Sequence, residues 1–247
     1  MVDIVVVSYN TLRLLGRCVA SIRAHTPPDA YRLWVVDNAS TDGSAAWLSS
    51  QTDLALIQSP SNVGYARACN LGAARGGGAH ILFLNGDAAP LPGWLPPLVA
   101  TLESGERVAV VAPRLINEQG LIVGAGVVGT NAAPVVRLWM QPEAMAQDDR
   151  ELDCVYLCGA AMMIKRRLVP ELGLFDERYP FYFEDADYAY NARAHGYRAV
   201  YCPRSRVVHT WGGSGRADPR LSRHFEAGRR LFESKWASMM SDPRVYG

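Results

Sequence analysis

The stretch from His80 to Pro90 reads HILFLNGDAAP, so an apolar run ends at the polar residues Asn85, Gly86 and Asp87. Such a run predicts a buried parallel strand, and open α/β sheets bind ligands outside the carboxyl ends of such strands. Asp87 could hold a divalent cation there, with Gly86 allowing the backbone to turn closely. Because Asn, Gly and Asp are also the commonest turn residues, this stretch alone predicts only a strand-to-loop turn.

A second acidic group consists of Glu184, Asp185 and Asp187, which follow the aromatic run 181–183 and open a helix predicted to end near Ala194. Acidic residues at a helix N-terminus stabilise it by about 0.3 to 1 kcal/mol, so capping alone explains one of them. Several repelling carboxylates behind aromatic side chains are costly unless a cation or a proton-accepting role explains them. We therefore favour a functional role for this group.

His209 closes a short apolar run beside Trp211. A single histidine is more often a satisfied core group than a metal ligand. It becomes a ligand candidate if the fold brings it to Asp87, which its position at a predicted strand end allows. The central expectation is therefore spatial: Asp87, His209 and the acidic helix start should share one edge of a sheet.

Strands and helices alternate along the first half of the chain, and these elements must position the chemical groups. Predicted strands cover 4–7, 33–36, 54–57 and 81–84, and predicted helices cover 12–22, a segment from about 44, and a segment from about 65 to the glycines at 76–78. This alternation predicts a Rossmann-like α/β fold with a mostly parallel central sheet and helices on both faces.

The second half is less regular. Predicted strands cover 108–112, 155–164, 198–201 and 207–209, and Pro203 separates the last two. Residues 121–128, with their glycines, predict a strand and a turn. Residues 132–150 lack periodicity, and we assign this long segment to contact with an acceptor.

The tail at 219–236 predicts an amphipathic helix. One face carries Leu221, Phe225, Phe232 and Trp236, while Arg223, Arg229 and Arg230 lie elsewhere. Most such helices dock on the core, and contact of the basic side chains with an anionic membrane is the minority alternative.

The composition excludes several classes of protein. The formal net charge is +1 over 247 residues, which favours neither nucleic acid nor an acidic polymer as a partner. Five scattered cysteines without CxxC spacing suit reduced thiols in a cytosolic enzyme, and we assign Cys154 and Cys158 to core packing. We expect no signal peptide, because Met1 leads directly into a strand, and no membrane span. The expected location is cytoplasmic, at most peripheral at the inner face of a membrane.

The turn after the first predicted strand, Ser8 to Thr11, contains no glycine. Dinucleotide-binding folds place a glycine-rich loop there so that helix N–H groups meet the phosphates. Phosphates bound here would need another counter-charge, which a cation on Asp87 would supply. We discount the GxGxxG pattern at 124–129, because Pro134 follows too soon for a helix to open.

Asp37 ends the second predicted strand, where a carboxylate can accept a hydrogen bond from a ribose hydroxyl or a pyrimidine N–H. Capping of the following helix, together with Asp42, is an equal alternative. The glycosylation pattern Asn38-Ala39-Ser40 is interpreted as a chance match in a chain without a signal sequence.

Several motifs stand in a family-specific order: VVVSYN (5–10), VVDNASTDG (35–43), NVG (62–64), NLG (70–72), FLNGD (83–87), GLFDE (173–177), YFEDAD (182–187) and His209. In this order the chain resembles the family 2 glycosyltransferases, particularly their bacterial rhamnosyltransferase-like branch, over residues 2–214. The resemblance implies a GT-A fold and inverting transfer of a sugar from a nucleotide diphosphate by single displacement. The branch implies a dTDP-linked deoxysugar such as rhamnose.

The resemblance also implies a donor site. The residues that would hold the nucleoside are Ser8, Asn10, Asp37 and Arg67. Asn85 and Gly86 also belong to the implied donor-binding residues, and Asn85 occupies the first position of the family's DxD motif. Its neutral amide is a poorer metal ligand than a carboxylate.

The metal and the base are implied in the same way. Asp87 takes the place of the last acid of the DxD motif and His209 that of a further ligand, both for Mg²⁺ or Mn²⁺. Asp185 would be the general base, while Glu184 and Asp187 would orient donor or acceptor.

The implied organisation is a GT-A domain at 1–215, with a nucleotide-binding half at about 1–113 and an acceptor and catalytic half at about 114–215. A C-terminal amphipathic helix and tail follow at 216–247. The implied partners are a nucleotide-sugar donor and a glycan, lipid-linked or small-molecule acceptor, and a homodimer is left open. The alternatives are a nucleotidyltransferase, which would need a glycine-rich basic loop, and a non-catalytic nucleotide-sugar-binding module, against which Asp185 stands.

Overall fold

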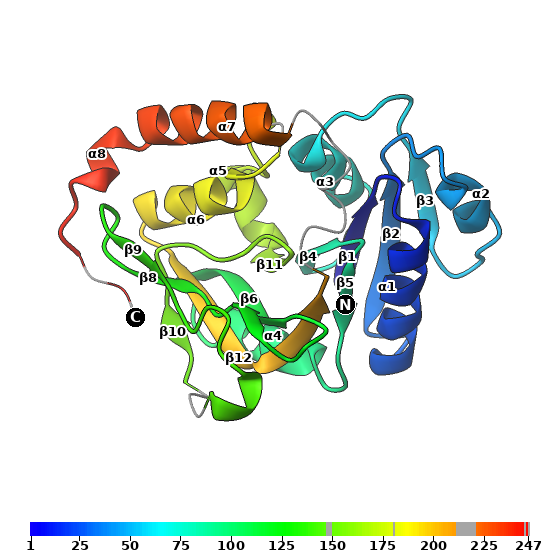
Figure 1. The fold of residues 1–247 in the computed structure, drawn as a ribbon, viewed down its shortest axis with the longest axis horizontal. Coiled ribbons are helices and arrows are strands. Elements are labelled where there is room, and N and C mark those ends of the chain that lie inside the picture. Colours follow the sequence, from blue (N-terminus) through cyan, green and yellow to red (C-terminus); the bar gives the residue numbers. More distant parts are fainter. Residues whose placement is uncertain (147–149, 180, 211–220, 245, 247) are drawn as a thin grey trace.

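The chain alternates strands and helices in its first hundred residues and becomes less regular afterwards (Figure 1). The computed structural model describes residues 1–146, 150–179, 181–210, 221–244 and 246. The strands are β1 (Val2–Ser8), β2 (Tyr31–Asp37), β3 (Ala55–Gln58), β4 (His80–Asn85), β5 (Ala88–Pro90), β6 (Val108–Ile116), β7 (Ile122–Gly124), β8 (Val127–Gly129), β9 (Pro134–Val136), β10 (Leu152–Asp153), β11 (Ala161–Lys165) and β12 (Arg198–His209). The helices are α1 (Leu12–His25), α2 (Ser44–Ser49), α3 (Tyr65–Ala73), α4 (Leu95–Glu103), α5 (Val169–Leu172), α6 (Glu184–Ala194), α7 (Leu221–Lys235) and α8 (Ala237–Met240), with 3-10 turns at η1 (Glu143–Met145) and η2 (Arg166–Leu168).

One large mixed sheet has the strand order β10-β12-β6-β11-β4-β1-β2-β3 within the described residues. The strands β3, β2, β1, β4, β6 and β12 all point the same way, because β11 lies antiparallel between β4 and β6. The short strands β5, β7 and β10 add antiparallel pairs. The predicted α/β fold with a mostly parallel sheet is confirmed, and the carboxyl ends of its parallel strands meet at one edge.

The two faces of the sheet carry separate parts of the core, because successive residues of a strand point to opposite sides. In β1, Ile4 and Val6 belong to the cluster that includes α1, α2 and α4, whereas Val5 and Val7 belong to the cluster that includes α3, α5 and α6. Gly72 lets α3 approach β1 closely, since a Cβ there would overlap the Val5 side chain. Helices therefore cover both faces, as predicted.

The C-terminal helix α7 lies over α6, outside the helical layer (Figure 1). Phe232 and Trp236 are buried against Tyr179 and Tyr190, which agrees with the predicted amphipathic face, but Phe225 is 42% exposed. In the part of the chain that the structure describes, no helix combines the length and apolar character needed to cross a membrane. The predicted domain boundary between 215 and 216 lies outside the described residues.

Two strand predictions were wrong. Pro203 does not divide β12. The pairing of β12 with β6 shifts register between Cys202 and Arg206, so no ladder hydrogen bond is required from Pro203, which has no N–H to donate. The predicted strand at 155–164 begins only at Ala161. The GxGxxG pattern at 124–129 lies in the short strands β7 and β8 and opens no helix.

Candidate active site

Asp87 and His209 lie together at the carboxyl edge of the sheet. The strand β5 pairs antiparallel with the end of β12, with His209 opposite Ala88, and this register sets the imidazole beside the preceding carboxylate. His209 Nε2 and Asp87 Oδ1 are 3.4 Å apart, and both residues are nearly buried. The Thr210 N–H donates to the Asp87 carbonyl at 3.0 Å. Strand pairing thus meets the condition under which His209 is a ligand candidate.

Glu184 and Asp185 open α6 in different environments. Burial raises the pKa of Asp185, and hydrogen bonds from the N–H groups of Gly159 at 2.7 Å and Ala186 at 2.8 Å, which favour its ionised form, oppose that increase. Glu184 is 6% exposed, and its Oε2 has no hydrogen-bond partner among the described residues. Burial, followed by the charge of Asp185, raises the pKa of Glu184 to about 8. At neutral pH, Glu184 is therefore mainly protonated beside a carboxyl group that accepts two N–H hydrogen bonds.

The segment 158–160 connects the two acidic groups. The Asn85 N–H donates to the Ala160 carbonyl at 2.9 Å, and the next residue back, Gly159, binds Asp185. Cys158 lies within electrostatic range of both acidic groups, and burial followed by these carboxylates raises its pKa to about 12. The two groups therefore face a common region. We call Asp87, Glu184, Asp185 and His209 the acidic site.

Gly159 has a role that sequence reasoning missed. It must be small because a Cβ there would lie 2.9 Å from the Asp185 Cβ, so the acid itself fills the space. Cys158 is half-buried and packs against the core, as predicted, and it also lies close to the acids.

Asp37 and Asn85 present buried oxygens at the ends of β2 and β4. Asp37 is 3% exposed, and its Oδ2 accepts from the Ser40 N–H at 3.3 Å. The Oδ1 atoms of Asp37 and Asn85 have no hydrogen-bond partner within the described residues. Helix capping is carried by Asp42, whose Oδ1 accepts from the Ser44 N–H at 3.0 Å. A buried acceptor without a partner costs roughly 1–3 kcal/mol, so both oxygens are suited to a ligand's donor groups.

Ser8 and Asn10 hold the turn after β1. The Ser8 hydroxyl lies 3.1 Å from the Thr11 hydroxyl in the protein interior. Asn10 Oδ1 accepts from the Thr41 N–H at 2.7 Å, which ties the turn to the loop after β2. These residues border the same edge of the sheet as Asp37, and their described contacts shape the loops there.

Asn38 binds the NVG motif. Its Nδ2 donates to Asn62 Oδ1 at 3.0 Å, and its Oδ1 accepts from the Val63 N–H at 2.9 Å. Asn38 is 3% exposed, so its amide is inaccessible to a glycosylating enzyme in the folded protein.

Arg67 and Asn70 lie on α3 against the loop 173–177. Asn70 Oδ1 accepts from the Phe175 N–H at 3.1 Å, and its Nδ2 donates to the Phe175 carbonyl at 2.8 Å. Arg67 Nε lies 3.8 Å from a Glu177 carboxylate oxygen, and both side chains are largely exposed. Arg67 therefore lies beside this loop, and the nucleoside contact implied for it stays a prediction.

Asp187 anchors the C-terminal helix. Its carboxylate accepts from the Tyr179 hydroxyl at 2.9 Å, from Lys235 Nζ at 2.9 Å and from Trp236 Nε1 at 2.8 Å. These contacts lie between α6 and α7, away from the acidic site. The prediction that Asp187 orients donor or acceptor is not supported by this geometry.

Tyr182 and Phe183 precede α6 with φ angles of 69° and 72°, in the left-handed region. Such a conformation costs on the order of 1–3 kcal/mol for a residue other than glycine and is concentrated at functional sites. Ring contacts of Phe183 with Phe225 at 5.1 Å and with Phe232 at 5.7 Å hold the turn in place. No periodic pattern in the sequence signals this conformation.

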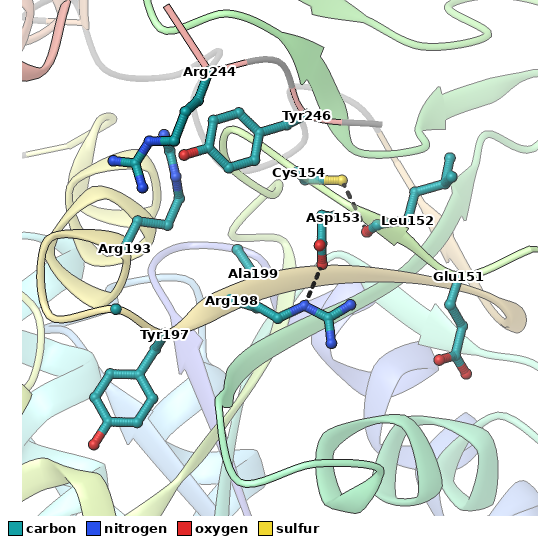
Figure 2. Close-up of a pocket in the computed structure, with 11 residues that line it drawn as sticks. Glu151, Leu152, Asp153, Cys154, Arg193, Tyr197, Arg198, Ala199, Arg244 and Tyr246 are labelled. Atoms are coloured by element: carbon teal, nitrogen blue, oxygen red, sulfur yellow. Dashed lines mark hydrogen bonds and ion pairs between the residues drawn. The ribbon is translucent and has the colours of Figure 1, made fainter. Parts of the chain in front are cut away.

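A cavity of about 560 Å³ lies at the opposite end of β12 (Figure 2). Its lining includes Arg193, Arg244 and Arg198, and Arg198 Nε donates to Asp153 at 2.7 Å. Since β12 rises about 3.3 Å per residue from Arg198 to His209, its ends are on the order of 30 Å apart. The cavity is therefore separate from the acidic site.

Asp87 and His209 offer a carboxylate oxygen and an imidazole nitrogen to a divalent cation. No group of three or more His, Cys, Asp or Glu side chains suited to a metal occurs among the described residues. Mg²⁺ in nucleotide sites is usually bound through one or two carboxylates and the phosphates of the substrate. The pair therefore fits a cation completed by a diphosphate, and it does not fit a self-contained structural metal site.

Sequence comparison identifies relatives of the chain. The family model described as Glycosyl transferase family 2 matches residues 3–173. The chain is 28% identical over 229 residues to the O-antigen biosynthesis protein RfbC of Myxococcus xanthus, covering 88% of this chain but only 18% of that protein. It is 24% identical over 245 residues to the N-acetylglucosaminyl-diphospho-decaprenol L-rhamnosyltransferase of Mycobacterium tuberculosis, covering 89% of this chain and 79% of that protein.

Solved structures share the fold. The TM-score is 0.72 with GalNAc-T7 bound to UDP, GalNAc and Mn²⁺, at 18% identity over 98% of this chain and 52% of that chain. It is 0.65 with the mannosyltransferase PcManGT of Pyrobaculum calidifontis in complex with GDP-Man and Mn²⁺, at 20% identity over 99% of this chain and 65% of that chain. Since the family model covers more than half of the sequence and the fold is that of GT-A enzymes, the chain belongs to glycosyl transferase family 2.

Proposed function

We propose that the protein is an inverting glycosyltransferase, which moves a sugar from a nucleoside diphosphate to an acceptor hydroxyl by single displacement. The observation that carries this proposal is the acidic site, where a carboxylate–imidazole pair and a carboxyl group that accepts two N–H hydrogen bonds meet across the segment 158–160. One group is suited to the leaving diphosphate and the other to the attacking hydroxyl. Membership of glycosyl transferase family 2 supports the reaction class.

The donor would lie along the carboxyl ends of β1, β2 and β4. The Oδ1 of Asp37, which has no partner in the described part of the chain, is suited to a ribose hydroxyl or a pyrimidine N–H. The Oδ1 of Asn85, likewise without a partner there, is suited to a hydroxyl of the donor. Asp87 and His209 would hold Mg²⁺ or Mn²⁺ beside the diphosphate. When bound, the cation would neutralise the negative charge that develops on the leaving group.

Asp185 would accept the proton of the attacking hydroxyl. Its two N–H donors fix the carboxyl group and oppose the increase in pKa that burial causes, while the neighbouring Glu184, whose pKa is raised to about 8, is mainly protonated at neutral pH and can donate a hydrogen bond. Two carboxyl groups whose environments separate their pKa values can serve as base and donor in one site. A single base with direct displacement leads to inversion at the anomeric carbon.

The relatives support a narrower proposal for the substrates. One of them is named as an L-rhamnosyltransferase whose acceptor carries a diphospho-decaprenol, and another as an O-antigen biosynthesis protein. By analogy, the donor of this chain would be a dTDP-linked deoxysugar such as rhamnose and the acceptor a lipid-linked glycan. Such an acceptor would bring the protein to a membrane surface as a peripheral enzyme.

The test is a thermal-shift panel of nucleotide sugars with and without Mn²⁺, followed by identification of the released nucleotide. We expect one donor to raise Tm in a Mn²⁺-dependent way and to release nucleoside diphosphate. The Asp87→Asn variant should lose the part of the Tm shift that depends on Mn²⁺. The control Asp53→Asn, which changes a carboxylate bonded to Arg23, should keep it. Pyrophosphate release would indicate a nucleotidyltransferase. Donor binding without transfer to any acceptor would indicate a binding module.

A further inference from the structure

Two exposed aromatic rings stand beside the acidic site. Tyr182, in the turn before α6, is 38% exposed, and Phe225, on α7, is 42% exposed. Their ring centroids are 5.8 Å apart, with an interplanar angle of 75°. The other large aromatic side chains between α6 and α7, such as Tyr190 and Phe232, are buried. Exposed apolar surface that adjoins polar groups commonly marks a binding site.

Phe225 points toward the protein. It precedes Phe232 by seven residues, which is close to two helical turns, so the two side chains share one face of α7. Phe232 is buried against Tyr190, with ring centroids 4.8 Å apart. Phe225 contacts Phe183 at 5.1 Å on the same side. The exposed part of the Phe225 ring therefore lies on the face of α7 that is directed toward the start of α6. A ligand bound there would contact both helices.

A chain of contacts connects these rings to the segment 158–160. Tyr182 contacts Phe181 with ring centroids 4.4 Å apart, and Phe181 contacts Tyr65 of α3 at 6.3 Å. The Tyr65 hydroxyl donates to the Gly159 carbonyl at 3.3 Å, and the Gly159 N–H binds Asp185. The rings are thus continuous with the backbone that holds the proposed base.

Tyr182 lies close to the acidic site, because it precedes Glu184 by two residues. Burial of its phenol, followed by the charges of Glu184 and Asp87, raises its pKa. Its φ of 69° lies in the left-handed region. The ring of Tyr182 is therefore next to the start of α6, which carries the proposed base.

We propose that Tyr182 and Phe225 form the acceptor subsite and stack against the C–H face of a sugar ring of the acceptor. The proposal rests on the proposed glycosyl transfer. A pyranose can pack its apolar face on an aromatic ring while its rim hydroxyls reach polar groups. Here the rim would meet Glu184 and Asp185. A lipid chain would gain nothing from these carboxyl groups, so a carbohydrate is the occupant that both the rings and the acids fit.

The test measures binding of three probes, methyl N-acetyl-α-glucosaminide, methyl α-rhamnoside and methyl α-glucoside. Saturation-transfer NMR is performed on the protein holding Mn²⁺ and the nucleoside diphosphate selected by the thermal-shift panel. Phe225→Leu keeps apolar bulk without the ring, and Tyr182→Leu does the same on the other element. The control is Tyr197→Phe, which removes a hydroxyl that bonds Glu171 near the start of β12.

We expect wild type to bind at least one glycoside, and each ring-to-Leu variant to weaken its Kd by about fivefold, the usual worth of an aromatic contact. Tyr197→Phe should bind as wild type does. The Tm shift by the donor should persist in every variant, which also shows that each is folded. Unchanged glycoside binding in both Leu variants, or no glycoside binding by wild type, overturns the subsite. If wild type binds no nucleotide-sugar donor, or transfers no sugar, the proposed function itself is refuted.

Discussion

Glu184 allows the acidic site to be tested through stability. Burial and the charge of Asp185 raise its pKa from 4.5 to about 8. The folded protein therefore holds a proton that the unfolded chain has lost between these pH values. Because the folded state binds more protons in this window, the free energy of unfolding should fall as pH rises from about 4.5 to about 8. Glu184→Gln, which is neutral at every pH, should remove this dependence.

The magnitude follows from the two pKa values. Their difference corresponds to about 5 kcal/mol at about 1.36 kcal/mol per pKa unit. The loss of folding stability caused by Glu184 is absent below about pH 4, where Glu184 is protonated in both the folded and the unfolded protein. It is complete above about pH 9, where Glu184 is ionised in both. One proton limits the slope to about 1.4 kcal/mol per pH unit within the window. The stability gained by Glu184→Gln over wild type should therefore grow with pH by several kcal/mol.

The assay is urea unfolding at pH 5, 6, 7, 8 and 9 for wild type, Glu184→Gln and the control Glu106→Gln, which changes an exposed carboxyl group. We expect the Glu184→Gln profile to diverge from wild type between pH 5 and 8, and the Glu106→Gln profile to run parallel to it. Parallel profiles for all three proteins would mean that Glu184 ionises normally in the folded state. The assignment of Glu184 as a protonated neighbour of the base would then be refuted.

Asp185→Asn should lower turnover by about 10² to 10⁴ while donor affinity by calorimetry stays near wild type, and near-normal turnover would contradict its role as the base. Excess EDTA should weaken donor binding, because the pair Asp87–His209 needs a cation between itself and the diphosphate, and unchanged affinity would exclude them as metal ligands. Asp187→Ala should lower the free energy of unfolding by about 3 kcal/mol in chemical denaturation, since the buried Tyr179 hydroxyl and the Trp236 indole N–H lose their acceptor and Lys235 keeps only Asp176. A loss below about 1 kcal/mol would contradict the anchoring role.

Local patterns predicted the part of the fold that local physics determines. The apolar run 81–84 before Asp87 can satisfy its backbone only in a buried sheet, and β4 lies at the centre of one. Strand β12 was harder, because the effect of Pro203 depends on its register against β6. The loop conformation of residues 155–160 was equally difficult to predict, since it depends on contacts with Asn85 and Asp185 from distant parts of the chain.

Helical periodicity could have refined the prediction for the acidic residues at the start of α6. Asp185 and Asp187 are two residues apart, so their side chains differ by about 200° around a helix and cannot face the same site. The spacing could therefore have excluded a shared role. It could not have indicated which residue faces the acidic site, because that depends on the packing of α7, which supplies Lys235 and the residue after it as partners of Asp187. The YFEDAD motif includes Tyr182, but nothing in the sequence signalled its left-handed conformation, which accompanies a ring contact with Phe225 from a distant part of the chain.

The anchoring of α7 through Asp187 has a consequence for how mutations in this protein should be judged. Trp236 is separated from the proposed base by some fifty positions in the sequence, yet it bonds the residue only two places beyond that base. A replacement at Trp236 would loosen the first turn of α6, misalign Asp185 and so lower turnover. Trp236 lies outside residues 3–173, which the family model matches, so a comparison limited to those residues would not include it. Variant libraries intended to alter acceptor preference should therefore extend through the last helices of the chain.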